Sequence, residues 1–211
     1  MKLKVGVLGS TRGTALQGVL EAVAAGELDV EIVLVVSDKA QAGILERAAK
    51  YGVTTLHLEA KGLTREEYDA RVTEVFRDAG AELLLMIGYM RITSNAFVDA
   101  WRGRLLNVHP SLLPAFGGLM NKSVHQAVLD AGVSETGCTI HQVTEEVDAG
   151  PIVLQLRCAV LPGDTADYPV LLAGWTPVGD EASAPDSEVV KTAIKSKRPA
   201  AADTPEGGGP R

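Results

Sequence analysis

Two polar side chains with complementary chemistry lie two residues apart in segment 105–114, Leu-Leu-Asn-Val-His-Pro-Ser-Leu-Leu-Pro. Asn107 carries an amide that donates hydrogen bonds, and the imidazole of His109 titrates near neutral pH, so it can pass protons. An amide donor beside an imidazole suits a reaction in which negative charge develops on an oxygen. The plainer interpretation is a hydrogen-bonded structural histidine before a turn.

A carboxylate follows in segment 145–151, Glu-Glu-Val-Asp-Ala-Gly-Pro. The small and rigid residues after Asp148 predict a tight loop that holds its side chain in place. A carboxylate near His109 would stabilise the imidazolium and raise its pKa. Glu145 and Glu146 are better explained as part of an ordinary acidic surface turn. We therefore take Asn107, His109 and Asp148 as the candidate catalytic residues.

The remaining nucleophile and ligand candidates are weaker. Ser111 lies near His109, but the surrounding sequence is not that of a nucleophile elbow, so no covalent nucleophile is predicted. His57, His125 and His141 do not sit at metal-ligand spacings with cysteines or carboxylates. We interpret these three histidines as structural or surface residues and predict no metal.

The turn after the first apolar segment reads Gly-Ser-Thr-Arg-Gly-Thr at residues 9–14. Backbone N–H groups of Gly13, Thr14 and Ala15 would open a helix there, and a helix N-terminus suits a phosphate. No lysine follows the glycine, and the G-x-G-x-x-G pattern is missing, so neither a Walker A loop nor a dinucleotide site is predicted. A turn that binds nothing is an equally good interpretation of this loop alone.

The elements that must position these side chains alternate along residues 1–131. This alternation of expected strands and helices predicts an α/β fold with a mostly parallel, doubly wound, Rossmann-like sheet. Strands are expected at about 4–9, 30–36, 53–58, 82–87 and 105–109, with a late pair at 136–143 and 152–160. Helices are expected at about 16–26, 41–51, 64–79, 94–101 and 123–131. Asn107 and His109 would then share one face at the carboxyl end of a strand, where such sheets bind ligands.

Composition narrows the class of protein. The 211 residues are 46% hydrophobic and 22% charged, which is ordinary for a globular domain, and the net charge of −7 gives no support for a nucleic-acid surface. No signal peptide pattern or membrane-spanning apolar run is evident. Cys138 and Cys158 are isolated, which predicts free thiols in a reducing compartment. We expect a cytoplasmic monomer or homodimer that acts on small molecules, without nucleic-acid or membrane partners.

Segments 105–114 and 147–151, in this order, resemble the folate-dependent formyltransferases. The likeness extends over residues 3–165 and includes Gly-Thr-Ala-Leu-Gln at 13–17 and Gly-Tyr-Met-Arg-Ile at 88–92. It implies 10-formyltetrahydrofolate as the formyl donor, without a metal. The likeness is to members that act in purine biosynthesis, which implies the glycinamide amine of a ribosyl 5-phosphate as the acceptor.

The resemblance also implies a role for each matching residue. Gly13, Thr14 and Ala15 match the loop that holds the acceptor's phosphate. The folate pocket is expected to be lined by Met90, Arg91, Ile92 and Thr93, with Arg65 and Asn107 as further folate contacts.

In the implied reaction the amine attacks the formyl carbon directly. Asn107 and a protonated His109 stabilise the tetrahedral oxyanion. Asp148 keeps His109 protonated and helps to move protons through an ordered water, while the loop leading to Asp148 closes over the pterin.

The sequence departs from the family in two places. Ala15 stands where the family usually has asparagine, and nothing beyond Thr165 matches the family's long C-terminal helix, which supplies a lysine and a glutamate to the acceptor site. We therefore expect a formyltransferase domain at 1–165 and an atypical tail at 166–211 that is at least partly disordered. A change of reading frame near residue 166 and an independently evolved tail are the two hypotheses. The apolar run Pro169–Trp175 is a candidate to cover the surface that the helix would protect.

Two other functions remain open at this stage. A formyltetrahydrofolate hydrolase shares the same arrangement of Asn, His and Asp, although it usually carries an additional N-terminal domain. A catalytically impaired protein that only binds folate or nucleotide would fit the atypical tail. The formyltransferase that acts on initiator methionyl-tRNA is disfavoured, because its basic surface and added C-terminal domain are not evident.

Overall fold

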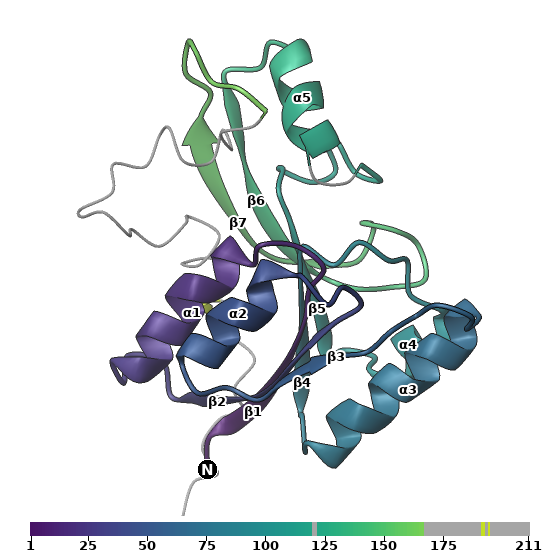
Figure 1. The fold of residues 1–211 in the computed structure, drawn as a ribbon. Helices are drawn as coiled ribbons and strands as arrows, with labels where there is room; N and C mark the ends of the chain where they lie inside the picture. Colours follow the sequence, from purple (N-terminus) through teal and green to yellow (C-terminus); the bar gives the residue numbers. More distant parts are fainter. Residues whose placement is uncertain (120–121, 167–190, 193, 195–211) are drawn as a thin grey trace, which may run out of the picture.

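The computed structural model describes residues 1–119, 122–166, 191–192 and 194, and within this part of the chain seven strands form one sheet (Figure 1). The strand order is β3-β2-β1-β4-β5-β6-β7. The strands are β1 (Leu3–Leu8), β2 (Val30–Ser37), β3 (Thr55–His57), β4 (Leu83–Ile87), β5 (Leu105–His109), β6 (Glu135–Gln142) and β7 (Ile152–Ala159). Pairs from β3 to β5 are parallel, whereas β6 and β7 join antiparallel, which confirms a mostly parallel doubly wound sheet.

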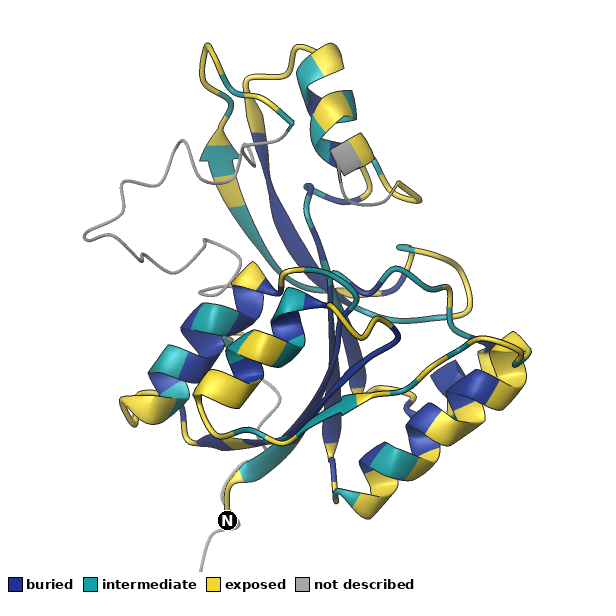
Figure 2. Ribbon diagram, in the orientation of Figure 1, coloured by how far each residue is buried: buried dark blue, intermediate teal, exposed yellow. Residues whose placement is uncertain are grey.

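Two layers of helices cover the sheet (Figure 1). The helices are α1 (Thr14–Ala24), α2 (Gly43–Lys50), α3 (Arg65–Asp78), α4 (Asn95–Ala100) and α5 (Lys122–Asp130). Helices α1 and α2 pack on one face, and α3 and α4 on the other, while α5 lies beside β6. The buried positions face the sheet and the exposed ones face outward (Figure 2), as amphipathic helices require.

Successive side chains of the central strands point to opposite faces of the sheet, so each strand contributes to the hydrophobic core on both faces. Val5 and Val7 of β1 lie in the core beneath α1 and α2, and Leu8 lies in the opposite core with Phe76 and Trp101. A strand that is buried on both faces needs apolar residues at successive positions, which explains the uninterrupted apolar sequence of β4.

Helix α3 begins at the predicted capping box. Thr64 Oγ1 accepts a hydrogen bond from the backbone N–H of Glu67, and a Glu67 carboxylate oxygen accepts one from the Thr64 N–H at 2.8 Å. Such a cap stabilises a helix by roughly 1 kcal/mol. It places Arg65 in the exposed first turn of α3.

The order of strands reverses between β1 and β4, because the chain turns to β2 on one side of β1 and to β4 and β5 on the other. The loops after β1 and β4 therefore leave the sheet toward opposite faces and open a crevice between them. Gly88, just after β4, has a φ of 58°, and a Cβ at this position would come within 2.3 Å of Thr11 Oγ1. The two loops are thus in close contact at the base of the crevice.

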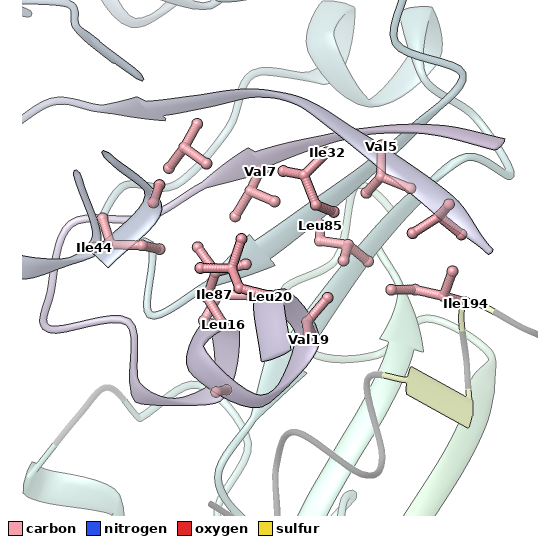
Figure 3. Close-up of a cluster of buried hydrophobic side chains, with 14 of the residues drawn as sticks. Val5, Val7, Leu16, Val19, Leu20, Ile32, Ile44, Leu85, Ile87 and Ile194 are labelled. Carbon is pink, nitrogen blue, oxygen red and sulfur yellow. The ribbon is translucent and has the colours of Figure 1, made fainter. Parts of the chain in front are cut away.

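Three described residues of the segment predicted to be an atypical tail lie against the sheet. Lys191, Thr192 and Ile194 are helical, and Ile194 is completely buried in the core beneath α1. Figure 3 shows its side chain near Val19 and Leu85. Apart from Ala166, the rest of the predicted tail, including Pro169–Trp175, lies outside the described residues. Among the helices that are described, none has the length and apolar character needed to cross a bilayer.

Candidate active site

A cavity of about 240 Å³ lies where the loops after β1 and β4 meet the carboxyl end of β5. It is lined by ten of the eleven residues predicted from sequence to act at the site, which are Gly13, Thr14, Ala15, Met90, Arg91, Ile92, Thr93, Asn107, His109 and Asp148. Arg65 is the exception, because it is exposed on α3 and does not line the cavity. Residues that are far apart in the sequence are therefore gathered in one place.

Asn107 is oriented by a histidine of the neighbouring strand. The antiparallel register of β5 and β6 pairs Asn107 with His141, and Asn107 Nδ2 lies 3.1 Å from His141 Nε2. His141 Nδ1 lies 2.9 Å from the carbonyl oxygen of Gln142. The roles of the ring nitrogens depend on the tautomer: with the proton on Nε2, His141 can donate to Asp148 Oδ1, 3.5 Å away, and with the proton on Nδ1 it donates to this carbonyl and Nε2 accepts from the amide of Asn107. One N–H of the Asn107 amide is then occupied, and the other remains for a ligand.

His109 is only 3% exposed, and both of its ring nitrogens face acceptors. Nε2 lies 3.3 Å from the carbonyl oxygen of Phe116, and Nδ1 lies 3.4 Å from Asp148 Oδ2. Burial lowers the pKa of His109 and outweighs the opposite effects of Asp148 and Phe116. The sequence-based expectation of a raised pKa was therefore wrong in its net direction, although Asp148 does act in the expected sense. The free protein holds His109 mainly as neutral imidazole at neutral pH.

Asp148 connects the two histidines. Its Oδ2 accepts a hydrogen bond from the backbone N–H of Gly118 at 2.8 Å, and its Oδ1 lies 3.5 Å from His141 Nε2. Burial raises the pKa of Asp148, but His141, the Gly118 N–H and His109 together lower it below its usual range. The carboxylate is consequently ionised at neutral pH and can stabilise positive charge on His109.

The turn that carries Asp148 is as tight as its sequence predicts. Asp148 has a φ of 56°, in the left-handed region that aspartate tolerates better than most residues. A Cβ at Gly150 would come within 1.8 Å of the carbonyl oxygen of Gln142, so only glycine fits where this turn passes β6. Pro151 O accepts a hydrogen bond from Gln142 N at 2.9 Å and closes the turn.

The loop before α1 has the conformation needed at a helix N-terminus that meets a ligand. Gly13 is in the left-handed region with a φ of 67°, and no side chain caps the helix. The loop is held from α2, because Arg47 Nε donates to Arg12 O at 2.8 Å and Ile44 N donates to Thr11 O at 3.1 Å. The loop is therefore held in place by contacts outside the cavity.

Two of the histidines that sequence reasoning set aside belong to the cavity. His141 is buried beside Asn107 and Asp148, and half-buried His125 of α5 lines the same space. Burial is the main cause that lowers the pKa of His125, and His109 adds to it. His57 is exposed, as expected for a surface residue. Metal-ligand spacings in the sequence could not identify His141. This residue reaches the site only because β6 pairs with β5 and so places it opposite Asn107.

Known proteins resemble this chain in sequence and in fold. Residues 3–168 match the family described as formyl transferase. The chain is 38% identical over 166 residues to the phosphoribosylglycinamide formyltransferase of Escherichia coli strain K12, covering 78% of this chain and 77% of that protein. It superposes on the crystal structure of glycinamide ribonucleotide transformylase 1 from Symbiobacterium toebii with a TM-score of 0.80 and 37% identity, over 92% of this chain and 86% of that one.

Longer relatives contain the same unit within larger proteins. The chain is 45% identical over 164 residues to the trifunctional purine biosynthetic protein adenosine-3 of Drosophila pseudoobscura pseudoobscura, and the match covers 76% of this chain but only 12% of that protein. The family match and the Escherichia coli relative both span most of the chain, so the chain belongs to the formyl transferase family.

Proposed function

We propose that this chain transfers the formyl group of 10-formyltetrahydrofolate to the primary amine of phosphoribosylglycinamide, in purine biosynthesis in the cytoplasm. The observation that carries the proposal is the meeting of Asn107, His109 and Asp148 in one cavity with a helix N-terminus suited to phosphate. The name of the Escherichia coli relative, which shares most of its length with this chain, supports the same acceptor.

The two substrates would approach from the two loops. Gly13, Thr14 and Ala15 at the N-terminus of α1 would bind the phosphate of the acceptor, because backbone N–H groups and the helix dipole favour an anion there. The segment 90–93 after β4 would bind the folate. Arg65 lies outside the cavity lining, so we assign it to a part of the folate that extends beyond the cavity.

The chemistry begins with attack of the neutral amine on the formyl carbon, which converts the carbonyl oxygen into an oxyanion. The second amide N–H of Asn107 stabilises this oxyanion. His109 is neutral at the start and takes the proton that the attacking amine must lose, and ionised Asp148 stabilises the resulting imidazolium. The proton then passes to N10 of the folate as the C–N10 bond breaks, which leaves formylated acceptor and tetrahydrofolate.

One assay separates this proposal from its alternatives. Protein is mixed with 10-formyltetrahydrofolate, with and without phosphoribosylglycinamide, and formylated acceptor, tetrahydrofolate and formate are each measured. Formylated acceptor in step with tetrahydrofolate, unaffected by a chelator such as EDTA, supports the proposed transfer without a metal. Formate without formylated acceptor would instead identify a hydrolase. Folate binding with neither product would identify a protein that binds without catalysis.

A further inference from the structure

Ser10 joins the two loops that border the cavity. Its backbone N–H donates to the carbonyl oxygen of Gly88 at 3.0 Å, and its hydroxyl oxygen accepts from the backbone N–H of Met90, also at 3.0 Å. The same hydroxyl donates to Asp38 Oδ1 at 2.6 Å. One small side chain thus connects the loop after β1, the end of β2 and the loop after β4.

Asp38 sets the direction of these hydrogen bonds. It is only 8% exposed, and a carboxylate can only accept, so the single proton of the Ser10 hydroxyl is committed to Asp38. The hydroxyl is then left with lone pairs only, which suits the N–H of Met90. Lys39 Nζ lies 3.6 Å from Asp38 Oδ2 and supplies a compensating charge at the surface.

This connection fixes the distance between the two proposed substrate loops. Met90 begins the segment 90–93 that lines the cavity, and Ser10 lies three residues before Gly13. The close contact of Thr11 with Gly88 leaves little room for the loops to approach further, and the Ser10 hydrogen bonds prevent them from separating. A transfer between two bound substrates depends on such a fixed separation, because a misplacement of about 1 Å can cost on the order of 10²-fold in rate.

We propose that Ser10 and Asp38 are positioning residues for the transfer reaction, which hold segment 90–93 at the separation from the acceptor loop at which formyl carbon and amine meet. The inference rests on the proposed function for its kinetic part. The part that concerns binding, namely that Ser10 holds segment 90–93 in place for folate, is argued from the hydrogen bonds of Ser10 and does not depend on the acceptor.

The test compares Ser10→Ala, Asp38→Ala and Asp38→Asn. Ser10→Ala removes both hydrogen bonds of the hydroxyl, and Asp38→Ala removes the acceptor that orients the proton of the Ser10 hydroxyl. Each variant should raise the KM for 10-formyltetrahydrofolate and lower kcat/KM by about 10- to 100-fold. The amide oxygen of Asp38→Asn can still accept from Ser10, so this variant should stay within about threefold of the parent chain. Ser134→Ala, at an exposed serine outside the cavity, is the matched control.

Tetrahydrofolate binding, measured by calorimetry on the same proteins, keeps this inference separate from the proposed acceptor. If the parent chain binds tetrahydrofolate but forms no formylated acceptor, the proposed function fails. The positioning role then stands only if Ser10→Ala and Asp38→Ala weaken that binding and Asp38→Asn keeps it close to that of the parent chain. A lower melting temperature with unchanged Kd and kcat/KM would show a purely structural role and overturn the inference. If Ser10→Ala does not fold, the comparison of Asp38→Ala with Asp38→Asn tests the positioning role. Equal kinetics in these two variants would overturn the inference.

Discussion

Replacement of Asp148 by asparagine removes the charge at the centre of the site with little change of shape. Asp148 Oδ2 lies 3.4 Å from His109 Nδ1, and the two side chains are only 11% and 4% exposed. At an effective dielectric constant of about 20, a carboxylate and an imidazolium at this distance attract by about 5 kcal/mol. Part of that energy is offset by the cost of burying the charges, so we expect kcat to fall by about 10²- to 10⁴-fold.

The assay measures kcat and KM for both substrates, together with an NMR titration of His109. KM should change little, because the imidazolium forms only during the reaction. Asp148 raises the pKa of His109 in the parent chain, so the pKa of His109 should fall further in Asp148→Asn. Asp78→Asn, at an exposed position on α3, controls for the loss of one negative charge. An unchanged kcat, or a His109 pKa that rises, would refute the proposed role of the carboxylate.

Three further predictions concern stability and the Asp148 turn. Ile194→Ala should lower the free energy of unfolding by about 2–5 kcal/mol in urea, whereas Ile152→Ala, at a side chain that is 49% exposed, should change it far less; equal effects would contradict the burial of Ile194. Gly150→Ala should displace Asp148 and lower kcat by at least about tenfold, and parental turnover would show that the turn has room. The pKa values of His109 and His125 are lowered from 6.5 in the folded chain, so the unfolded chain binds more protons and the free energy of unfolding should fall as the pH drops below 6.5. His125→Asn should make this fall shallower, and parallel curves of unfolding free energy against pH for the variant and the parent chain would contradict the prediction.

Most elements of the fold could be predicted because their signals are local. The Val-rich run of β2 and the Thr64–Glu67 capping box each predict an element from a few neighbouring residues, and the structure confirms both. The placement of Asn107 and His109 followed from their position at the end of a strand in an alternating pattern. A parallel sheet then brings the carboxyl ends of its strands to one edge whatever its loops contain.

The parts that could not be predicted depend on contacts between distant residues. His141 reaches Asn107 only because β6 pairs with β5 antiparallel in one particular register, over a separation of 34 residues. The net pKa shift of His109 depends on burial, which outweighs the attraction of Asp148 and leaves no trace in spacing. The burial of Ile194 could not be predicted either, since the apolar residues around it are too few to form a sustained periodic pattern.

The burial of Ile194 has a consequence for synthesis of the chain. Strand β1 shares its core with a residue that is synthesised after all seven described strands. Sheet and helices up to β7 can assemble on the nascent chain, but this core stays open on one side until Ile194 emerges. Until Ile194 has been made, the nascent chain therefore exposes apolar surface beside β1, and chaperones that bind such surface would meet the protein there.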